Sequence, residues 1–231
     1  VLNVPVMSHM LRLLYENGIR EAAVTLKYRA YDIMNYYRTH DTSGVRLCFF
    51  TEEQPLGTAG GVKSASDFLD SDFVVVSAVC DIPIADAMRF HAEKHARATI
   101  VTARKSVPLE LGGVVCHENG EVARFVEKPS WRRVLSDRVN TGIYVFSRDI
   151  LSEIPEGVFC DFSRDVFPKL IGRGLYGYAA DGYWCDVGSL DAYYSCNRDA
   201  LENKIRGVSF TPEENFIHED AAIAPGACVR G

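Results

Sequence analysis

Three separate segments of this chain place charged or amide side chains beside apolar runs that are typical of strands. Glu127 and Lys128 follow one such run, Asn140 opens another, and Asp186 is the single acid inside a third, WCDVG at 184–188. An Asp within an apolar run needs a partner or a metal ion if it is buried. Each segment alone is equally compatible with a structural role. Jointly they predict a pocket with an acceptor for hydroxyls, an ammonium for a phosphate and a carboxylate for a metal.

A glycine-rich turn, EEQPLGTAGG at 52–61, separates the apolar run 45–50 from a helical pattern at 62–69. A phosphate-binding P-loop is excluded because Val62 replaces the glycine that must precede the lysine, here Lys63. The dinucleotide pattern GxGxxG is absent as well. A tight strand-to-helix turn is one interpretation. The number of glycines favours a second one, in which the backbone contacts a ligand.

Two other groups of polar residues have simpler explanations. His91 and His95 stand four residues apart on a predicted helix, which is a spacing for metal ligands, but without a third ligand nearby a solvated helix face is favoured. Asp70 and Asp72 resemble the paired carboxylates of metal-dependent sugar transferases. They precede their strand, however, so a helix-to-strand turn is the better interpretation.

The elements that must position these residues alternate between strands and helices as far as about residue 206. Such alternation indicates a parallel sheet covered on both faces, with ligands beyond the carboxyl ends of the strands. Glu118-Asn119-Gly120 predicts a hairpin, so an antiparallel excursion is expected inside the sheet. The expected helices are 5–16, 31–38, 62–69, 84–95, 162–172 and 190–204. The expected strands are 22–26, 45–50, 73–77, 98–102, 113–117, 121–127, 139–146, 175–179 and 183–187.

The tail, 207–231, is expected to be a separate unit from 1–206. Ile217, Ile223 and Val229 recur every six residues, which is the period of a hexapeptide β-helix. Such coils stack to bury an apolar edge, so this tail is expected to be the truncated beginning of one. A plain C-terminal loop is the alternative.

Composition excludes several classes of function. The 231 residues are 47% hydrophobic, enough for a core, and no window reaches the length of a membrane span. The net charge of −6 argues against a nucleic-acid surface. Seven cysteines without a CxxC pair indicate reduced thiols, and with no signal-peptide pattern a cytosolic protein without membrane partners is expected.

Five motifs, in this order and spacing, resemble the sugar-1-phosphate nucleotidylyltransferases, and among these the mannose-1-phosphate guanylyltransferases most. They are PLGTAGG, EKPSW, VNTGIYVF, DFSRDVFPKL and GYWCDVGS. The resemblance covers about residues 1–206. It implies a Rossmann-like, mostly parallel mixed sheet with helices on both faces, followed by the start of a left-handed β-helix.

The resemblance also implies substrates and a reaction. The partners would be a nucleoside triphosphate, with GTP favoured, and a sugar 1-phosphate, with mannose 1-phosphate favoured; the cofactor would be Mg²⁺. Gly57, Thr58 and Ala59 would contact the base and ribose of the nucleotide. A β-helix tail with apolar edges would favour a homo-oligomer.

On the sugar side, Glu127 resembles the acid that accepts sugar hydroxyls, and Gly112 and Asn140 resemble further sugar contacts. Lys128 resembles the ammonium on the sugar phosphate and Asp186 one of two magnesium carboxylates, so these two would be the catalytic residues. The transfer itself depends on positioning and charge neutralisation rather than on a protein nucleophile.

Two departures from the family pattern limit this interpretation. Family members begin with a strand and a glycine-rich loop that would precede VLNVP, so a gap with exposed strand edges is expected in the sheet. The Gly-Asp that binds metal is also missing near Ala78; Asp81 could replace it only in a rerouted loop, and a turn role is favoured. The alternatives are therefore an enzyme fragment and an inactive nucleotide-sugar-binding regulatory paralogue. A metal-dependent glycosyltransferase is disfavoured by the position of Asp70 and Asp72.

Overall fold

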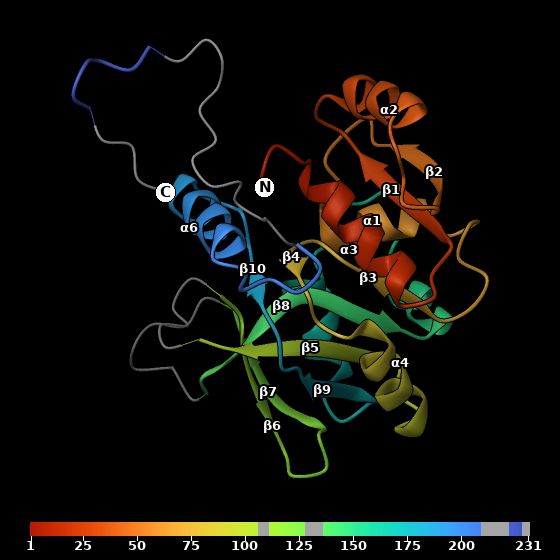
Figure 1. The fold of residues 1–231 in the computed structure, drawn as a ribbon. Coiled ribbons are helices and arrows are strands. Elements are labelled where there is room, and N and C mark those ends of the chain that lie inside the picture. Colours follow the sequence, from red (N-terminus) through yellow and green to blue (C-terminus); the bar gives the residue numbers. More distant parts are fainter. Residues whose placement is uncertain (106–110, 128–135, 209–221, 228–231) are drawn as a thin grey trace.

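The computed structural model describes residues 1–105, 111–127, 136–208 and 222–227 (Figure 1). The α-helices are α1 (Val6–Glu16), α2 (Ala30–Thr39), α3 (Gly57–Ser64), α4 (Ile84–Glu93), α5 (Phe167–Leu170) and α6 (Leu190–Leu201). A 3₁₀ helix, η2 (Arg148–Glu153), and a π-helical turn, η3 (Phe162–Val166), complete the helical elements of these ranges. The strands are β1 (Glu21–Leu26), β2 (Arg46–Thr51), β3 (Phe73–Val75), β4 (Val79–Cys80), β5 (Ala98–Arg104), β6 (Gly113–Cys116), β7 (Val122–Val126), β8 (Arg138–Phe146), β9 (Leu175–Ala179) and β10 (Trp184–Cys185).

The predicted strands and helices occur in the predicted order, but β4 and η2 were not predicted and two of the helices differ from the prediction. The helix expected at 62–69 begins at Gly57 and ends at Ser64. Glycines disfavour a helix locally, but here the N–H groups of Ala59 and Gly60 both donate to the carbonyl of Cys160, so a contact distant in sequence sets the start of the helix. The helix expected at 162–172 is instead the turn η3 followed by the short α5.

The sheet is mixed, as expected, but the expectation that it is mostly parallel is wrong. The larger sheet has the order β7-β6-β8-β5-β9, and β3 also pairs with β8. Among the described strands only β1–β2 and β5–β9 pair in parallel, while β8 is antiparallel to β3, β5 and β6. Apolar strand patterns reveal burial on both faces but not strand direction, which explains the error.

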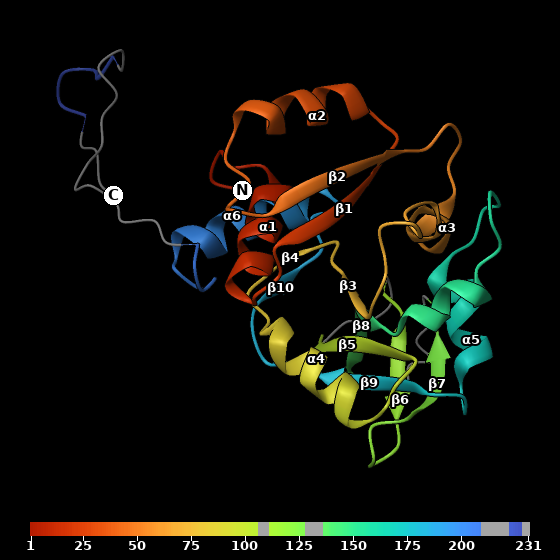
Figure 2. The same cartoon turned by 90° about the vertical axis from the view of Figure 1, so that its right-hand side faces the viewer.

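The long strand β8 lies at the centre of a layered core. Because side chains alternate along a strand, Tyr144 and Phe146 point to one face and Ile143 and Val145 to the other. The first face is covered by η3 and α5, whose Phe162 packs on Phe146 with ring centroids 4.7 Å apart. The second face is covered by α4. Figure 2 shows α4 and α5 on opposite sides of the strands.

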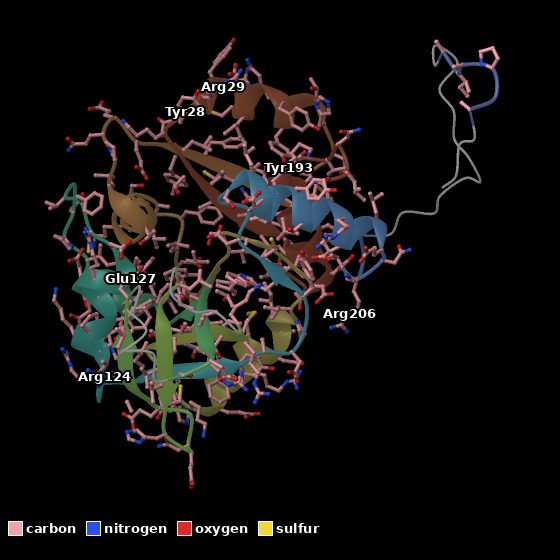
Figure 3. The ribbon with its side chains drawn as sticks, turned by 90° about the vertical axis from the view of Figure 1, so that its left-hand side faces the viewer. Tyr28, Arg29, Arg124, Glu127, Tyr193 and Arg206 are labelled. Atoms are coloured by element: carbon pink, nitrogen blue, oxygen red, sulfur yellow. The ribbon has the colours of Figure 1, made fainter. Side chains whose placement is uncertain are left out.

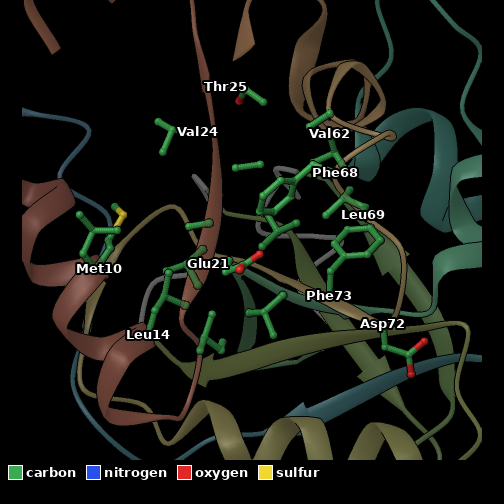
Figure 4. Close-up of a pocket in the computed structure, with 18 of the residues that line it drawn as sticks. Met10, Leu14, Glu21, Val24, Thr25, Val62, Phe68, Leu69, Asp72 and Phe73 are labelled. Atoms are coloured by element: carbon green, nitrogen blue, oxygen red, sulfur yellow. The ribbon is translucent and has the colours of Figure 1, made fainter. Parts of the chain in front are cut away.

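A groove separates the two parts of the fold. The parallel pair β1–β2 belongs to a sheet of its own, and among the described strands β3 pairs only with β8. Facing strands β1 and β3 both line an apolar groove of about 450 Å³, closed by residues of α1, α3 and the segment 65–72 (Figure 4). The exposed strand edges expected from the sequence are therefore present.

Beyond residue 208 the structure describes residues 222–227 of the tail, which are exposed. Of the three residues with the six-residue period, Ile217 and Val229 lie outside those residues, and Ile223 is 44% exposed. The β-helix and the boundary at 206 and 207 stay predictions.

The six described cysteines are free thiols, of which Cys48 is exposed. No helix in the described ranges combines the length and apolar character that crossing a bilayer requires.

Candidate functional site

Three of the predicted sugar-binding residues lie in one row across three neighbouring strands. In the ladder between β6 and β7, Gly113 faces Val126, so Gly112 faces Glu127 one position further on. On its other side β6 meets β8 with Gly113 opposite Val139, and the N–H of Asn140 donates to the carbonyl of Gly112 at 2.7 Å. Residues far apart in sequence, 112, 127 and 140, are thus brought together by strand register.

Glycine at position 112 leaves room for the acid beside it. A Cβ there would lie 2.8 Å from the Phe125 ring and 3.0 Å from the Glu127 Oε2. Glu127 itself is exposed, and Figure 3 shows it on the side of the molecule that carries α3 and α5. An exposed carboxylate beside a bare backbone can accept hydrogen bonds from ligand hydroxyls. Lys128, the predicted phosphate ligand, lies outside the described residues.

A bulge in β8 directly follows Asn140. The register with β5 shifts between Ile100 and Thr102, so that Val101 lies opposite the segment 141–143. Gly142 adopts φ +75° there, and a Cβ on it would lie 2.5 Å from the Ser77 Oγ. Thr141 closes the bulge by donating from Oγ1 to the Val101 carbonyl at 2.7 Å. Bulges of this kind commonly turn a side chain toward a site.

The amide of Asn140 is held by hydrogen bonds on both sides. Its Oδ1 accepts from the N–H of Gly142 at 3.0 Å, and its Nδ2 donates to the Tyr144 hydroxyl at 2.9 Å. The Nδ2 also faces Ser163 Oγ at 3.5 Å. Burial raises the pKa of Tyr144, whose ring is 7% exposed, so this hydroxyl stays protonated at neutral pH.

The glycine-rich turn packs against the segment 158–161. Gly57 has φ +74°, and a Cβ on it would lie 2.6 Å from the carbonyl oxygen of Cys160. At Gly60 a Cβ would lie 2.9 Å from the carbonyl oxygen of Val158. Ala59 is fully buried and its N–H is bonded to Cys160, which gives it a packing role. Contacts of Gly57, Thr58 and Ala59 with a nucleotide stay predictions.

Thr58 links this turn to the sugar side. Its Oγ1 donates to Asp161 Oδ2 at 2.9 Å and accepts from the N–H of Phe162 at 3.0 Å. Asp161 also caps η3 through Arg164, and Ser163 in that turn is the residue that faces Asn140. π-Helical turns are rare and occur often at functional sites. The predicted nucleotide and sugar residues are therefore connected through 161–163.

Asp186 is exposed, so the condition under which it would need a partner or a metal ion is not met. It directly follows β10, whose Trp184 donates from Nε1 to the carbonyl of Thr141 at 2.8 Å, next to Asn140. Within the described residues no hydrogen bond or ion pair engages its carboxylate. The β4–β10 register puts Ala78 opposite Asp186. The part of the chain that the structure describes contains no cluster of three acids, histidines or cysteines that could hold a metal.

Asp81 does not join Asp186. In the same ladder it lies opposite Tyr183, at the other end of β4. Its Oδ1 accepts from the N–H of Tyr183 at 2.7 Å and its Oδ2 from the N–H of Arg206 at 2.8 Å, and the side chain is 7% exposed. These bonds give Asp81 a structural role in fixing the turn after β4, and its metal role stays a prediction that they do not support.

The minor candidates also receive structural roles. His91 is buried, not solvated as expected, because its Nδ1 bonds to Thr99 Oγ1 at 2.9 Å under β5. Burial lowers its pKa. His95 is exposed, so the two do not form a metal pair. Asp70 and Asp72 are exposed in the turn before β3, as expected.

Sequence reasoning missed Tyr144, Ser163 and Asp161 as parts of this site. Tyr144 has the same strand parity as Asn140, which is the one signal that could have placed its side chain on the same face. Asp161 is a typical N-cap residue before an apolar turn. The bulge and the π-helical turn have no local signal, since both depend on contacts with other strands.

Solved structures share this arrangement of elements. The fold matches a crystal structure of HddC from Yersinia pseudotuberculosis with a TM-score of 0.71 at 22% identity, covering 85% of this chain and 88% of that one. It matches an apo UDP-glucose pyrophosphorylase with a TM-score of 0.73 at 14% identity, covering 88% and 89% of the two chains. The fold is thus the mixed α/β fold of nucleotide-sugar transferases.

The chain belongs to the nucleotidyl transferase family, whose model matches residues 1–203. It is 36% identical over 228 residues to a UTP–glucose-1-phosphate uridylyltransferase of Synechocystis sp., covering 90% of this chain and 58% of that protein. It is 28% identical over 240 residues to a mannose-1-phosphate guanylyltransferase of Mycobacterium tuberculosis, covering 99% and 65%. The chain therefore spans about three-fifths of the length of these relatives.

Proposed function

We propose that this chain binds a nucleoside triphosphate and a sugar 1-phosphate and forms a nucleoside-diphosphate sugar and pyrophosphate. GTP and mannose 1-phosphate are the substrates proposed first. The observation that carries this proposal is the row of Glu127, Gly112 and Asn140, which brings the carboxylate and the amide, two acceptors for sugar hydroxyls, together on neighbouring strands. The family and the five motifs support it.

In the proposed reaction an oxygen of the sugar phosphate attacks the α-phosphorus of the nucleotide. A new phosphorus–oxygen bond forms, and the bond to the bridging oxygen of the β-phosphate breaks, releasing pyrophosphate. Such a step needs alignment of the two phosphates and neutralisation of their charge. Glu127 and Asn140 would hold the sugar, while Lys128 would pair with its phosphate.

The residues present supply one of the carboxylates that a Mg²⁺ ion would need, that of Asp186. Magnesium in such sites takes one or two carboxylates and completes its shell with substrate phosphates and water. Asp186 is exposed and free of partners among the described residues, so it could hold the ion. When bound, the ion would neutralise phosphate charge and orient the attacked phosphorus. Ala78, opposite Asp186, supplies no second carboxylate.

Two further candidates have observations in their favour. The 36% identical relative is named a uridylyltransferase, which favours UTP and glucose 1-phosphate as a second substrate pair. Ala78 opposite Asp186 favours a nucleotide-sugar-binding protein without turnover. All three candidate functions use the same row of Gly112, Glu127 and Asn140, which we call the sugar row. Binding measurements with one set of ligands therefore distinguish the three functions.

Titration calorimetry of this chain with GDP-mannose, UDP-glucose and GDP, with and without Mg²⁺, tests the proposal. We expect GDP-mannose to bind more tightly than GDP, with Mg²⁺ strengthening the binding. Asp186→Ala should remove the Mg²⁺ effect, whereas Asp191→Ala, an exposed acid on α6, should retain it. Asn140→Ala should weaken GDP-mannose but not GDP.

Each other outcome has a definite meaning. Tighter binding of UDP-glucose would favour the second pair. Binding without pyrophosphate release from GTP and mannose 1-phosphate would favour the non-catalytic binder. A folded chain that binds none of the three ligands would reject the proposal.

A further inference from the structure

We propose that Tyr144 is a positioning residue that fixes the amide of Asn140, so that Asn140 meets the sugar as a hydrogen-bond acceptor only. This inference rests on the proposed function of the site. It assigns a role to a buried hydroxyl that does not itself touch the ligand.

The argument starts from the hydrogen-bonding capacity of the amide. An Asn side chain has two N–H hydrogens and two lone pairs on oxygen. In this structure Nδ2 is 2.9 Å from the Tyr144 hydroxyl and 3.5 Å from the Ser163 Oγ, so both hydrogens have an acceptor. Oδ1 accepts one bond, from the N–H of Gly142 at 3.0 Å. The group left for a ligand is the second lone pair of Oδ1.

The orientation of the amide is fixed by its surroundings. The N–H of Gly142 can only donate, so the atom that meets it must be the oxygen. The reversed amide would place an NH₂ group against that N–H. Gly142 itself is held in place by the bulge, where its carbonyl accepts from Ser77 Oγ at 3.0 Å.

The Tyr144 hydroxyl is itself rigidly placed. Its ring packs among three phenylalanines, with centroids 5.5 Å from Phe146, 5.5 Å from Phe162 and 5.1 Å from Phe167. A ring so enclosed has one position, so its oxygen is a fixed acceptor for Nδ2. Burial raises the pKa of Tyr144, and the hydroxyl therefore remains neutral beside the site.

The two described side chains of this row, those of Glu127 and Asn140, then both offer acceptors to a ligand. The carboxylate of Glu127 is an acceptor, and Asn140 offers only an oxygen. A ligand here must bring donors, and the hydroxyls of a sugar ring are such donors. A site that reads hydroxyls in this way rejects analogues that lack them, because its acceptors are left unpaired.

The test compares Tyr144→Phe with a matched control. Tyr37 is also buried, and its hydroxyl also forms a side-chain hydrogen bond, with Ser8 Oγ at 2.8 Å, but this bond lies between α1 and α2. Calorimetry would measure GDP-mannose and GDP binding for the wild-type chain, Tyr144→Phe, Tyr37→Phe, Asn140→Ala and the Tyr144→Phe/Asn140→Ala double variant.

We expect Tyr144→Phe to weaken GDP-mannose about three- to tenfold, which is the effect of one ordinary hydrogen bond, and to leave GDP unchanged. In the Asn140→Ala background the same substitution should have no further effect. Tyr37→Phe should alter neither ligand. A wild-type preference for GDP-mannose that survives Tyr144→Phe would overturn the inference, as would equal weakening of both ligands or an additive double variant. If the wild-type chain does not distinguish GDP-mannose from GDP, the proposed function fails instead.

Discussion

The sheet around β8 and the pair β1–β2 are both built from short apolar strands, but their surroundings differ. β8 is bonded on both edges and covered on both faces, and Phe146 and Ile143 on it are fully buried. Among the described strands β1 pairs only with β2, and it lines the groove of about 450 Å³. The sugar row of Gly112, Glu127 and Asn140 lies on the sheet around β8. Helix α3, with Thr58, lies between this sheet and the β1–β2 pair.

The two regions therefore differ in how firmly they hold their side chains. A side chain such as Asn140, supported by a close-packed sheet, keeps one orientation. A region that borders an open groove has fewer apolar contacts and opens at lower free energy. The nucleotide side of the site is therefore expected to respond more to bound ligand than the sugar side. Four sets of substitutions test this contrast.

The largest effect should come from one phenylalanine in each region. Phe146→Ala removes a fully buried ring from the packed sheet and should lower the free energy of unfolding by about 3–5 kcal/mol. Phe68→Ala is its matched control on the groove, where the ring is only partly buried, and should cost less than half as much. Urea unfolding measures both. Equal losses would mean that the groove region is packed as tightly as the sheet.

The two carboxylates of the β4–β10 ladder should behave in opposite ways. Asp81→Asn places an NH₂ group where both carboxylate oxygens accept backbone N–H bonds, so stability should fall by about 1–3 kcal/mol. In this variant Mg²⁺ should still strengthen GDP-mannose binding. Asp186→Asn should change the free energy of unfolding by less than about 0.5 kcal/mol but abolish the strengthening of GDP-mannose binding by Mg²⁺. The reverse pattern would make Asp81 the metal ligand.

A smaller effect is expected at the junction. Thr58→Val keeps the shape of the side chain but loses the bonds to Asp161 and Phe162, at a cost of about 1–2 kcal/mol. Thr39→Val is the control, since Thr39 makes only exposed bonds at the end of α2. Hydrogen exchange of the α3 amides would locate the loss. An unchanged exchange pattern would show that Thr58 does not tie α3 to η3.

The smallest effect concerns pH. Burial lowers the pKa of His91 below its ordinary value of 6.5, despite the raising effects of Asp72 and Asp149. The unfolded chain then binds more protons, so this stability is present above pH 6.5 and is lost as pH falls toward the folded pKa, by at most about 1.4 kcal/mol per pH unit. His91→Gln should flatten the dependence of stability on pH between 7 and 5. Burial lowers the pKa of His9 too, so some slope should remain in the variant.

Several features of the site could be predicted and others could not. The motifs identified Glu127, Asn140 and Asp186 as functional candidates, and 139–146 was correctly predicted to be a strand. The bulge at 141–143 was not predictable, because it appears only where β8 meets β5. The exposure of Asp186 was not predictable from the apolar run around it, because the strand β10 ends at Cys185, one residue before Asp186. His91 was expected to be solvated because nothing local reveals Thr99 beneath it.

By itself the sequence determined the order of most strands and helices, the layered α/β class and the family, because periodicity and motifs are local properties of the chain. Only the tertiary structure decided strand direction, the row of Gly112, Glu127 and Asn140, and the separation of Asp81 from Asp186. It also decided that the glycines at 57 and 60 approach the segment 158–160. These features depend on register between segments distant in sequence, and register is set by the packing of the whole sheet rather than by any one strand.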